Sequence, residues 1–487
     1  MRGGGGCRDG DLGARSVGDG RHGHHSDEAD RGHEGDDDEA DGECEATLRT
    51  ARAGRHDVHR VGLRHGIPRT KIAGDDRRDS GVWRPGTPRG TSISAEREFG
   101  QRVYERRAEN AYREGMEFDF ARLSRHPDVE APNLHAVDAA DRLILDEADA
   151  GRPASGAVAV IGDAYGALTL GAATRWGLPV RTHQDGLVGE RALAANAADA
   201  GLSDAYASFE LEAGLLADVQ LVLLRLPRSL DALDEIAADL ARWAAPEVVV
   251  VAGGMVKHMT PAMNDVLRRR FARLDVSHAR QKARVLIARD VLPAEASAPP
   301  EWPASRVDPT TGLTVVAHGA AFAGATVDVG TRFLLPLLAD AVPDARDIID
   351  LGCGTGVIAA SLARSRPQAH VRGTDQSAAA VASARLTAEA NGVAVAVARD
   401  DGLGAVADAS ADLIVLNPPF HIGAAVHTGI ALKLFADAAR VLRPGGELWC
   451  VWNSHLQYRP QLERIVGPTR QIARNRTFTV TASARRR

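Results

Sequence analysis

The fold of this chain is decided by the stretch DIIDLGCGTG at residues 347–356. Its first half is mostly apolar and predicts a buried strand, and the glycines that follow permit a tight turn with close backbone approach to a ligand. The Ala-rich segment 357–364 then predicts a helix, whose N-terminal N–H groups would point at that ligand. This order of strand, glycine turn and helix predicts an open α/β sheet with a ligand at the carboxyl ends of its strands.

Three more segments, at 369–374, 393–398 and 413–416, predict strands that end at the same edge. The first leads into Asp375, which is placed to accept both hydroxyls of a ribose, and the second leads to Asp401, which would accept from an adenine amine. A lone glycine turn is shared by nicotinamide and flavin enzymes. The two acids favour a ligand that carries adenosine.

The third of these strands is followed by NPPF at residues 417–420. Its two prolines lack N–H donors and stiffen the turn, so the carbonyls of Asn417 and Pro418 are fixed acceptors. Together with the amide oxygen of Asn417 and the flat face of Phe420, they suit a planar group that bears an exocyclic NH2. A nucleobase is such a group, although a bare Asn-Pro-Pro is also an ordinary turn after a strand.

With these features, the segment from Thr326 to Val480 resembles the class I S-adenosylmethionine-dependent methyltransferases of the "small" superfamily. In that group NPPF marks members that methylate an amino or amide nitrogen. With His421 after it, the motif is most similar to the bacterial ribosomal RNA guanine-N2 methyltransferases. The lead-in TVDVGTRF at 326–333, which in those enzymes closes over the methionine end of the cofactor, matches too, as does NSHLQY at 453–458.

The resemblance implies S-adenosylmethionine as cofactor, ribosomal RNA as partner, and no metal. It assigns catalysis to Asn417, Pro418 and Phe420, substrate binding to Pro419, Phe420 and His421, and cofactor binding to Asp350, Gly352, Gly354, Gly356, Asp375, Asp401 and Asn417. A base inside a helix does not reach such a pocket, so the target guanine is expected to be unpaired or flipped out.

An internal duplication supports this assignment. Residues 158–168 can be aligned with 348–358 so that the first and last glycines of the turn match, and the same offset puts Asp185 on Asp375. Further along, RLPR at 225–228 takes the place of NPPF. The apolar framework is kept and the chemistry is lost. This pattern predicts an α/β protein of two tandem Rossmann-like methyltransferase domains, the N-terminal one degenerate; the alternative is two unrelated α/β domains with similar strand patterns.

Three parts are expected along the chain. Residues 1–115 are rich in Gly, Arg, Asp and His without apolar periodicity, so they are expected to be a disordered tail, or a start read upstream of the true one. Residues 116–300 would form the degenerate domain, which serves RNA positioning or acts as a scaffold. Residues 301–487 would form the catalytic domain, after a Pro-rich join near 295–310.

Composition agrees with a cytoplasmic enzyme. The chain has 487 residues, 44% of them hydrophobic, and no apolar run of about 18 residues, so no membrane partner is expected. The start lacks the pattern of a secretory leader, and the four cysteines show no metal spacing, which favours a reducing compartment. No stable protein partner is expected, and the protein is predicted to be a monomer.

The net charge of −6 is unusual for an RNA binder, whose affinity comes largely from neutralising phosphates. The charge is uneven, with +3 from residue 301 onward and −7 over residues 116–300. RNA contacts in the first domain would therefore need a local basic patch, either at Arg225 and Arg228 or among the arginines of 268–273.

Among the ribosomal RNA enzymes the large-subunit (23S) branch is the nearest match, because QKARVL at 281–286 also resembles it. The small-subunit (16S) guanine-N2 enzymes are the first alternative. Protein glutamine-N5 methyltransferases, which tend to carry Tyr where this chain has Phe420, are a more distant one. So are DNA adenine-N6 methyltransferases, which need a target-recognition domain. A non-enzymatic RNA-binding module would be expected only if the second copy had also lost its motifs.

Overall fold

The computed structural model describes residues 118–131, 133–293, 301–418 and 427–486. They all belong to one compact unit, Gly86–Arg487. The expected tail lies outside the described residues, and so do Pro419, Phe420 and His421 of the expected site. Among the described residues, no helix is long and apolar enough to cross a bilayer.

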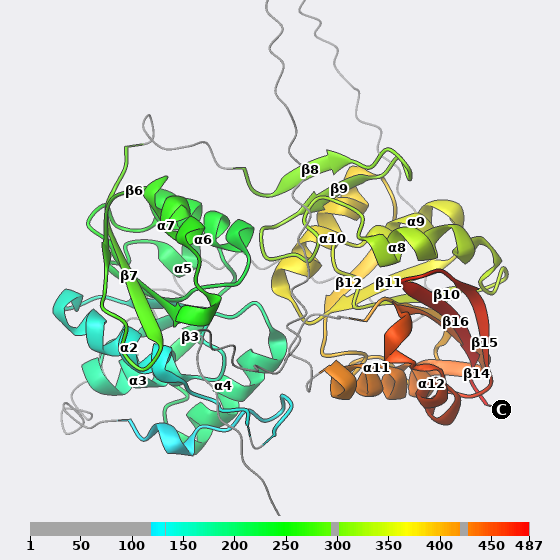
Figure 1. Ribbon diagram of the computed structural model, residues 1–487, viewed down its shortest axis with the longest axis horizontal. Coiled ribbons are helices and arrows are strands. Elements are labelled where there is room, and N and C mark those ends of the chain that lie inside the picture. Colours follow the sequence, from blue (N-terminus) through cyan, green and yellow to red (C-terminus); the bar gives the residue numbers. More distant parts are fainter. Residues whose placement is uncertain (1–117, 132, 294–300, 419–426, 487) are drawn as a thin grey trace, which may run out of the picture. The chain divides into compact units, whose positions relative to one another are not determined.

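The first domain, residues 118–293, folds around a mixed sheet with helices on both faces (Figure 1). Its strand order is β3-β2-β1-β4-β5-β7-β6, where β1 to β5 are parallel and β7 is antiparallel to both neighbours. The strands are β1 (Val158–Ile161), β2 (Val180–His183), β3 (Tyr206–Ser208), β4 (Leu221–Arg225), β5 (Val249–Met255), β6 (Phe271–Val276) and β7 (Ala283–Val291). Helices α2 (Ala139–Ala148), α3 (Ala167–Trp176) and α4 (Leu187–Ala200) cover one face, and α5 (Ala213–Leu216), α6 (Leu230–Trp243) and α7 (Pro261–Arg268) cover the other.

The second domain, residues 301–486, repeats this arrangement. Its strand order is β12-β11-β10-β13-β14-β16-β15, the same as in the first domain. The strands are β10 (Asp347–Leu351), β11 (His370–Asp375), β12 (Val395–Arg399), β13 (Ala411–Leu416), β14 (Leu442–Asn453), β15 (Thr469–Arg474) and β16 (Phe478–Ala484). Helices α8 (Val329–Leu334), α9 (Val357–Ser365) and α10 (Ala378–Ala390) lie on one side, and α11 (His427–Val441) and α12 (Arg459–Ile465) on the other. A two-stranded ribbon of β8 (Ala304–Val307) and β9 (Thr314–Ala317) precedes them. The shared order is what a duplication predicts.

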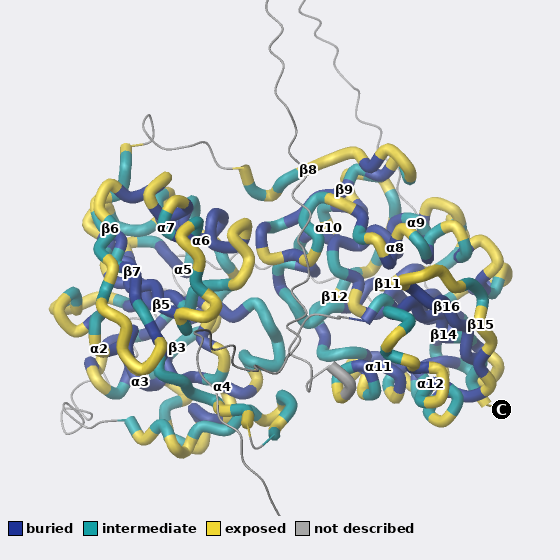
Figure 2. Tube along the Cα trace, viewed as in Figure 1, coloured by how far each residue is buried: buried dark blue, intermediate teal, exposed yellow. Residues whose placement is uncertain are grey.

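The core lies along the central strands of each sheet (Figure 2). All four residues of β1 are buried, and so is the run 413–416 at the end of β13. Continuous apolar runs suit parallel strands that are covered on both faces. The polar residues that follow these runs are therefore carried to the sheet edge, where the backbone leaves the core.

The sheet register shows how the two copies correspond. In the second domain, Leu351 at the end of β10 pairs with Thr374, one residue before Asp375. In the first domain, the equivalent pairing ends at His183, one residue before Gln184. The connection between the first two strands is thus one residue shorter in the first copy.

Gln184 therefore occupies the place of Asp375, and the expected match of Asp185 with Asp375 is wrong by one residue. The other expected match is confirmed. The pairing of β1 with β4 ends one residue before Arg225, and that of β10 with β13 ends one residue before Asn417.

Candidate active site

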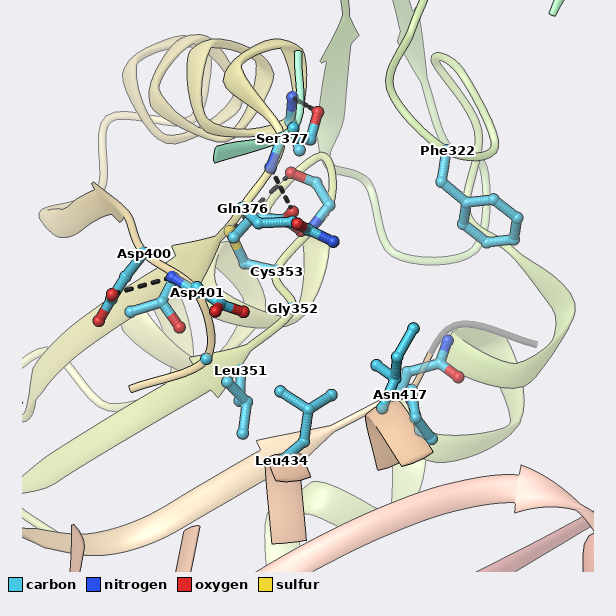
Figure 3. Close-up of a pocket in the computed structure, with 18 of the residues that line it drawn as sticks. Phe322, Leu351, Gly352, Cys353, Gln376, Ser377, Asp400, Asp401, Asn417 and Leu434 are labelled. Atoms are coloured by element: carbon cyan, nitrogen blue, oxygen red, sulfur yellow. Dashed lines mark hydrogen bonds between the residues drawn. The ribbon is translucent and has the colours of Figure 1, made fainter. Parts of the chain in front are cut away.

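A cavity of about 550 Å³ opens at the carboxyl ends of β10, β11 and β13 (Figure 3). Of the residues expected from the sequence, its wall holds Gly352, Gly354, Asp375, Asp401, Asn417 and Pro418. Residues from three strand ends and the glycine turn thus meet in one place, as the parallel sheet predicts.

The glycines of the turn divide into two roles. Gly354 has φ +51°, and a Cβ built on it would meet no atom within 4 Å, so its open side allows a ligand to approach the backbone. Gly356 has φ +76°, and a Cβ there would stand 2.8 Å from the Cβ of Ala384 on α10. Gly356 is therefore required by the packing of α10 against the turn, and it is not among the residues of the wall.

Asp350 lies beneath the turn rather than in the wall of the cavity. Its side chain is buried, and Oδ2 accepts a hydrogen bond of 2.9 Å from the Ala359 N–H on α9. Burial raises the pKa of this carboxyl to about 7. The position suits support of the turn from behind, so we propose that Asp350 acts on the cofactor through the turn.

Asp375 presents a carboxylate that the backbone fixes at both oxygens. Oδ1 accepts from the Ser377 N–H and Oδ2 accepts from the Gly354 N–H, each at 3.0 Å. Burial raises the pKa of Asp375. Each carboxylate oxygen keeps a lone pair for another donor, so the group is oriented to accept from two neighbouring hydroxyls.

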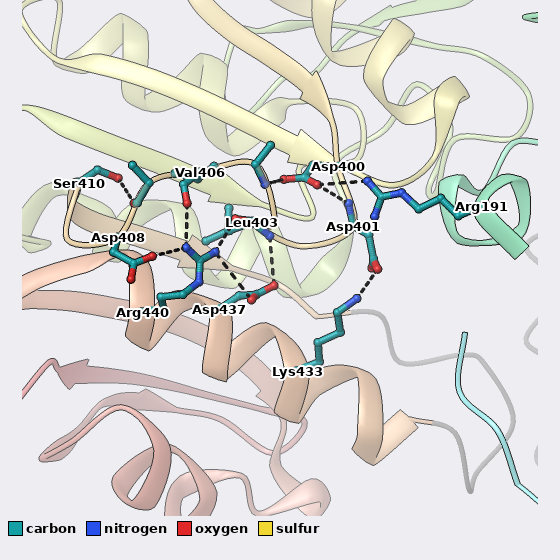
Figure 4. A network of polar contacts seen from close by, with 12 residues as sticks. Arg191, Asp400, Asp401, Leu403, Val406, Asp408, Ser410, Lys433, Asp437 and Arg440 are labelled. Carbon is teal, nitrogen blue, oxygen red and sulfur yellow. Dashed lines mark hydrogen bonds and ion pairs between the residues drawn. The ribbon is translucent and has the colours of Figure 1, made fainter. Parts of the chain in front are cut away.

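Asp401 lies in the wall, and its carboxylate forms an ion pair with Lys433 of α11 (Figure 4). The adjacent Asp400 is buried and accepts from the Asp401 N–H at 2.9 Å and from the Ala405 N–H at 2.8 Å. Both residues line the cavity, and Asp400 in addition shapes the loop through these two hydrogen bonds. No motif in the sequence pointed to Lys433.

Asn417 is held by the first turn of α8. Its Nδ2 donates to Asp328 Oδ2 at 3.0 Å and to Thr331 Oγ1 at 3.1 Å. Since a carboxylate only accepts, the amide nitrogen must face Asp328 and the amide oxygen must face away. That oxygen is buried and has no hydrogen-bond partner among the described residues. A buried acceptor left in this state is costly, which indicates a place for a donor from a ligand.

One aromatic residue of the wall was not singled out in the sequence. Phe322 lies on the loop between β9 and α8, and 61% of its surface is exposed although it borders the cavity (Figure 3). Such an exposed ring is a flat apolar surface for a bound planar group. Its signal in the sequence was only its place a few residues before the TVDVGTRF lead-in.

The first domain has filled the equivalent space. Gln184, at the place of Asp375, donates through Nε2 to the carbonyl of Asp163 in its own glycine turn. Helix α4 lies against the same turn, because a Cβ on Gly189 would stand 2.6 Å from the carbonyl oxygen of Ala164. The turn is therefore packed against protein where the second domain leaves it open.

The comparisons with known proteins agree with this architecture. Residues 312–482 match the family described as methyltransferase small domain, and residues 114–292 match the family described as RLMG N-terminal domain. The chain is therefore a methyltransferase with two copies of one α/β fold. The glycine turn of the second copy faces the cavity, and the turn of the first copy is covered by protein.

The relatives define the family more narrowly. The chain is 35% identical over 366 residues to the ribosomal RNA large subunit methyltransferase G of Streptomyces avermitilis, covering 74% of this chain and 95% of the relative. It is 36% identical to the protein of the same name from Pseudomonas aeruginosa, covering 74% and 96%. The chain belongs to the ribosomal RNA large subunit methyltransferase G family.

One solved structure shares the whole two-domain fold. It is a T. thermophilus 16S rRNA N2 methyltransferase (RsmC) in complex with AdoMet and guanosine, with a TM-score of 0.60 and 23% identity. The match covers 75% of this chain and all of that one. At this identity the likeness establishes the fold.

Proposed function

We propose that this chain transfers a methyl group from S-adenosylmethionine to the exocyclic N2 of a guanine in large-subunit (23S) ribosomal RNA. The observation that carries the proposal is the buried amide oxygen of Asn417, which lacks a partner among the described residues and borders the cavity. An exocyclic amine supplies the donor that this oxygen needs. The names of the relatives favour the large subunit over the small one.

The wall of the cavity fits the cofactor. The open side of Gly354 accommodates a ligand against the backbone, and the fixed carboxylate of Asp375 accepts the two ribose hydroxyls. Asp401 accepts from the adenine amine while it stays paired with Lys433. The cofactor would supply a methyl group that its sulfonium already activates, so the protein has mainly to position the nucleophile and exclude water. The S–CH3 bond would break as the N–CH3 bond forms, S-adenosylhomocysteine would leave, and the methylated nitrogen would release one proton to solvent.

Guanine N2 is a weak nucleophile because its lone pair is delocalised into the ring. The Asn417 Oδ1 and the Pro418 carbonyl accept its two N–H groups and turn the lone pair toward the methyl. Both oxygens also stabilise the positive charge that develops on the nitrogen, as preorganised acceptors do. Pro419, Phe420 and His421, which are outside the described residues, complete the base pocket in this proposal, with Phe420 stacked on the base.

The substrate also fixes where the reaction occurs. An enzyme that acts on ribosomal RNA works in the cytoplasm in this proposal, as a monomer whose macromolecular partner is the RNA.

The test uses ribosomal RNA from a strain that lacks the gene. Purified protein and labelled S-adenosylmethionine are incubated with its 23S and 16S RNA, and the digested nucleosides are identified by mass spectrometry. Label in N2-methylguanosine from 23S RNA is the expected result. Label confined to 16S RNA would favour the alternative small-subunit activity, and label in N6-methyladenosine would overturn the proposal.

A further inference from the structure

The first domain contributes to the wall of the cofactor cavity. Asp185, Gly186 and Val188 line it together with residues of the second domain. Asp185 and Gly186 belong to the loop between β2 and α4, and Val188 lies in the first turn of α4. This loop is the counterpart of the loop between β11 and α10 that follows Asp375. The loop after β2 in the degenerate copy therefore lies against the loop after Asp375 in the intact copy.

The two loops, at residues 185–187 and 376–378, are joined by reciprocal backbone hydrogen bonds. The Leu187 N–H donates to the Gln376 carbonyl at 3.0 Å, and the Ala378 N–H donates to the Asp185 carbonyl at 2.9 Å. Gly186 and Ser377 form the antiparallel bridge between them. The backbone just after Asp375 is thus held by the first domain.

The carboxylate of Asp185 adds a second hold on this backbone. Its Oδ1 accepts from the Ser377 hydroxyl and from the Ala379 N–H on α10, each at 2.9 Å. Ser377 in turn donates its N–H to Asp375 Oδ1 at 3.0 Å. A continuous chain of hydrogen bonds therefore runs from Asp185 to the carboxylate that faces the cavity.

Arg399 ties the same two loops from the end of β12. Its Nη2 donates to the carbonyls of Gln184 at 2.8 Å and Asp185 at 3.0 Å, and its Nε donates to the Gln376 carbonyl at 3.2 Å. Nη1 pairs with Glu190 on α4 at 2.8 Å. One guanidinium thus fastens the first domain to the cofactor side of the second, with geometry that a lysine does not reproduce.

We propose that the degenerate domain completes the cofactor site of the catalytic domain, with Asp185 as a positioning residue that holds Ser377 and, through it, Asp375. The domain then has a task beyond RNA positioning or scaffolding: it sets the affinity for the adenosine part of the cofactor. This inference rests on the proposed use of S-adenosylmethionine.

The test compares Asp185→Ala with Asp185→Asn in the full chain. The alanine variant loses the oxygen that accepts from the Ser377 hydroxyl and from the Ala379 N–H at the start of α10. Loss of an acceptor at a helix N-terminus should therefore weaken binding of S-adenosylmethionine and of adenosine about three- to tenfold. Asparagine keeps an oxygen acceptor and should restore binding to within about twofold. The difference between wild type and Asp185→Ala should shrink for 2′-deoxyadenosine, which lacks one of the two hydroxyls that Asp375 accepts.

Steady-state kinetics separate positioning from a general loss of structure. We expect KM for S-adenosylmethionine to rise in Asp185→Ala by the same factor as Kd, with kcat and KM for RNA unchanged. A loss of folded protein would instead lower kcat. Asp275→Ala is the matched control, since it removes ion pairs with Arg273 and Arg289 on the outer strands of the same domain.

Glu190→Gln tests the contact between the two loops with a smaller change, because it removes the negative charge of one partner of Arg399 and leaves Asp185 in place. It should raise KM for S-adenosylmethionine less than Asp185→Ala does, again without an effect on KM for RNA. Equal affinity of wild type and Asp185→Ala for both S-adenosylmethionine and adenosine would overturn this inference alone. A wild-type protein that binds no S-adenosylmethionine would overturn the proposed function instead.

Discussion

Arg225 and Asn417 stand at the same place in the two sheets, and each binds the aspartate that caps the helix beside it. Asn417 binds Asp328, the N-cap of α8, at 3.0 Å. Arg225 binds Asp138, the N-cap of α2, at 2.7 Å. The two copies have therefore kept the contact between strand end and helix while changing the residue that makes it.

The chemical difference lies in the hydrogen-bonding atoms that each side chain still offers once it has bound its aspartate. An amide that donates to the capping aspartate still has an oxygen to offer a substrate, whereas a guanidinium has donors only. The Arg225 guanidinium also keeps the pKa of Asp138 below its usual range, although burial alone would raise it. The exchange of asparagine for arginine at this position therefore keeps the contact with the capping aspartate and removes the acceptor for a substrate.

The first prediction concerns this acceptor. Asn417→Ala should lower single-turnover methylation about 100- to 1,000-fold, the usual effect of removing one preorganised electrostatic group. Cofactor affinity, measured by calorimetry, should change less than about threefold, since Asn417 faces the base in the proposal. Near-normal turnover would show that Asn417 does not orient the nucleophile.

Asn417→Asp is the sharper variant. It keeps an acceptor but puts a second carboxylate oxygen against Asp328, where the amide nitrogen is 3.0 Å from Oδ2. Two carboxylates at this distance favour sharing a proton, and the shared state restores the donor that asparagine supplies. We therefore expect low activity at neutral pH that rises, relative to wild type, as the pH is lowered.

The second prediction is that each chain binds one S-adenosylmethionine. Only the second domain has an open turn, because in the first Gln184 donates into the turn and α4 packs on it at Gly189. Calorimetric titration should give a stoichiometry of one cofactor per chain. A stoichiometry of two would mean that the first copy keeps a working site.

The third prediction concerns Asp375. Asp375→Ala should weaken cofactor binding by about 1–3 kcal/mol, the worth of charge-assisted hydrogen bonds. Because burial raises the pKa of Asp375, the wild-type affinity should fall as the pH is lowered through that raised pKa and the carboxylate takes up a proton. Asp375→Asn should bind weakly with little of this pH dependence, as measured by titrations across pH.

The strand ends were predictable from the sequence because each apolar run stops at a polar residue. In parallel strands those residues meet at one edge, which is how Asp375, Asp401 and Asn417 were found together. The separate roles of the glycines were not predictable. Whether a Cβ would meet solvent or Ala384 depends on the packing of α10, which no local motif encodes.

The contacts between the domains were also outside the reach of sequence patterns. The offset that matched Asp185 to Asp375 failed because the connection after β1 is one residue shorter, and sheet register alone reveals this. Asp185 and Arg399 are far apart in the chain, and each resembles an ordinary solvated residue at a strand end. Their meeting follows only from the way the two folded domains pack.

The fourth prediction concerns Asp350. Burial raises its pKa to about 7, above an unfolded value near 4. Between these two values the folded state keeps a proton on Asp350 that the unfolded chain releases, and this proton stabilises the folded state. The stabilisation is complete below about pH 4 and is lost as the pH rises to about 7.

Asp350→Asn should remove that loss. The decrease in unfolding free energy between pH 4 and pH 8, measured by denaturant titration, should be smaller in the variant than in wild type. The difference is at most about 4 kcal/mol, since each pKa unit is worth about 1.4 kcal/mol. Equal pH dependence in both proteins would contradict the raised pKa of Asp350.

Most arginines that were expected to form a basic patch on the first domain are engaged within it. Arg225 is bound to Asp138 and Asp141. In the second group Arg268, Arg269 and Arg273 form ion pairs with Asp265, Asp234 and Asp275, and Arg270 is buried. Of the six arginines in these two groups, Arg228 is the one that is exposed and has no ion pair among the described residues.

The fifth prediction is that RNA binds a basic edge formed by Arg228, Lys257 and His258. All three are exposed near the ends of β4 and β5. Partial burial lowers the pKa of His258 most, and the positive charges of Arg228 and Lys257 lower it further, so the three side chains lie close together. The double variant Arg228→Glu/Lys257→Glu should weaken RNA binding. It should also reduce the slope of log Kd against log salt by about one for each phosphate that the variant no longer neutralises.

The affinity of the double variant for the cofactor should not change. Arg268→Glu is the matched control, since Arg268 is exposed but already paired with Asp265. A salt slope that is the same in the double variant and in wild type would place the RNA elsewhere.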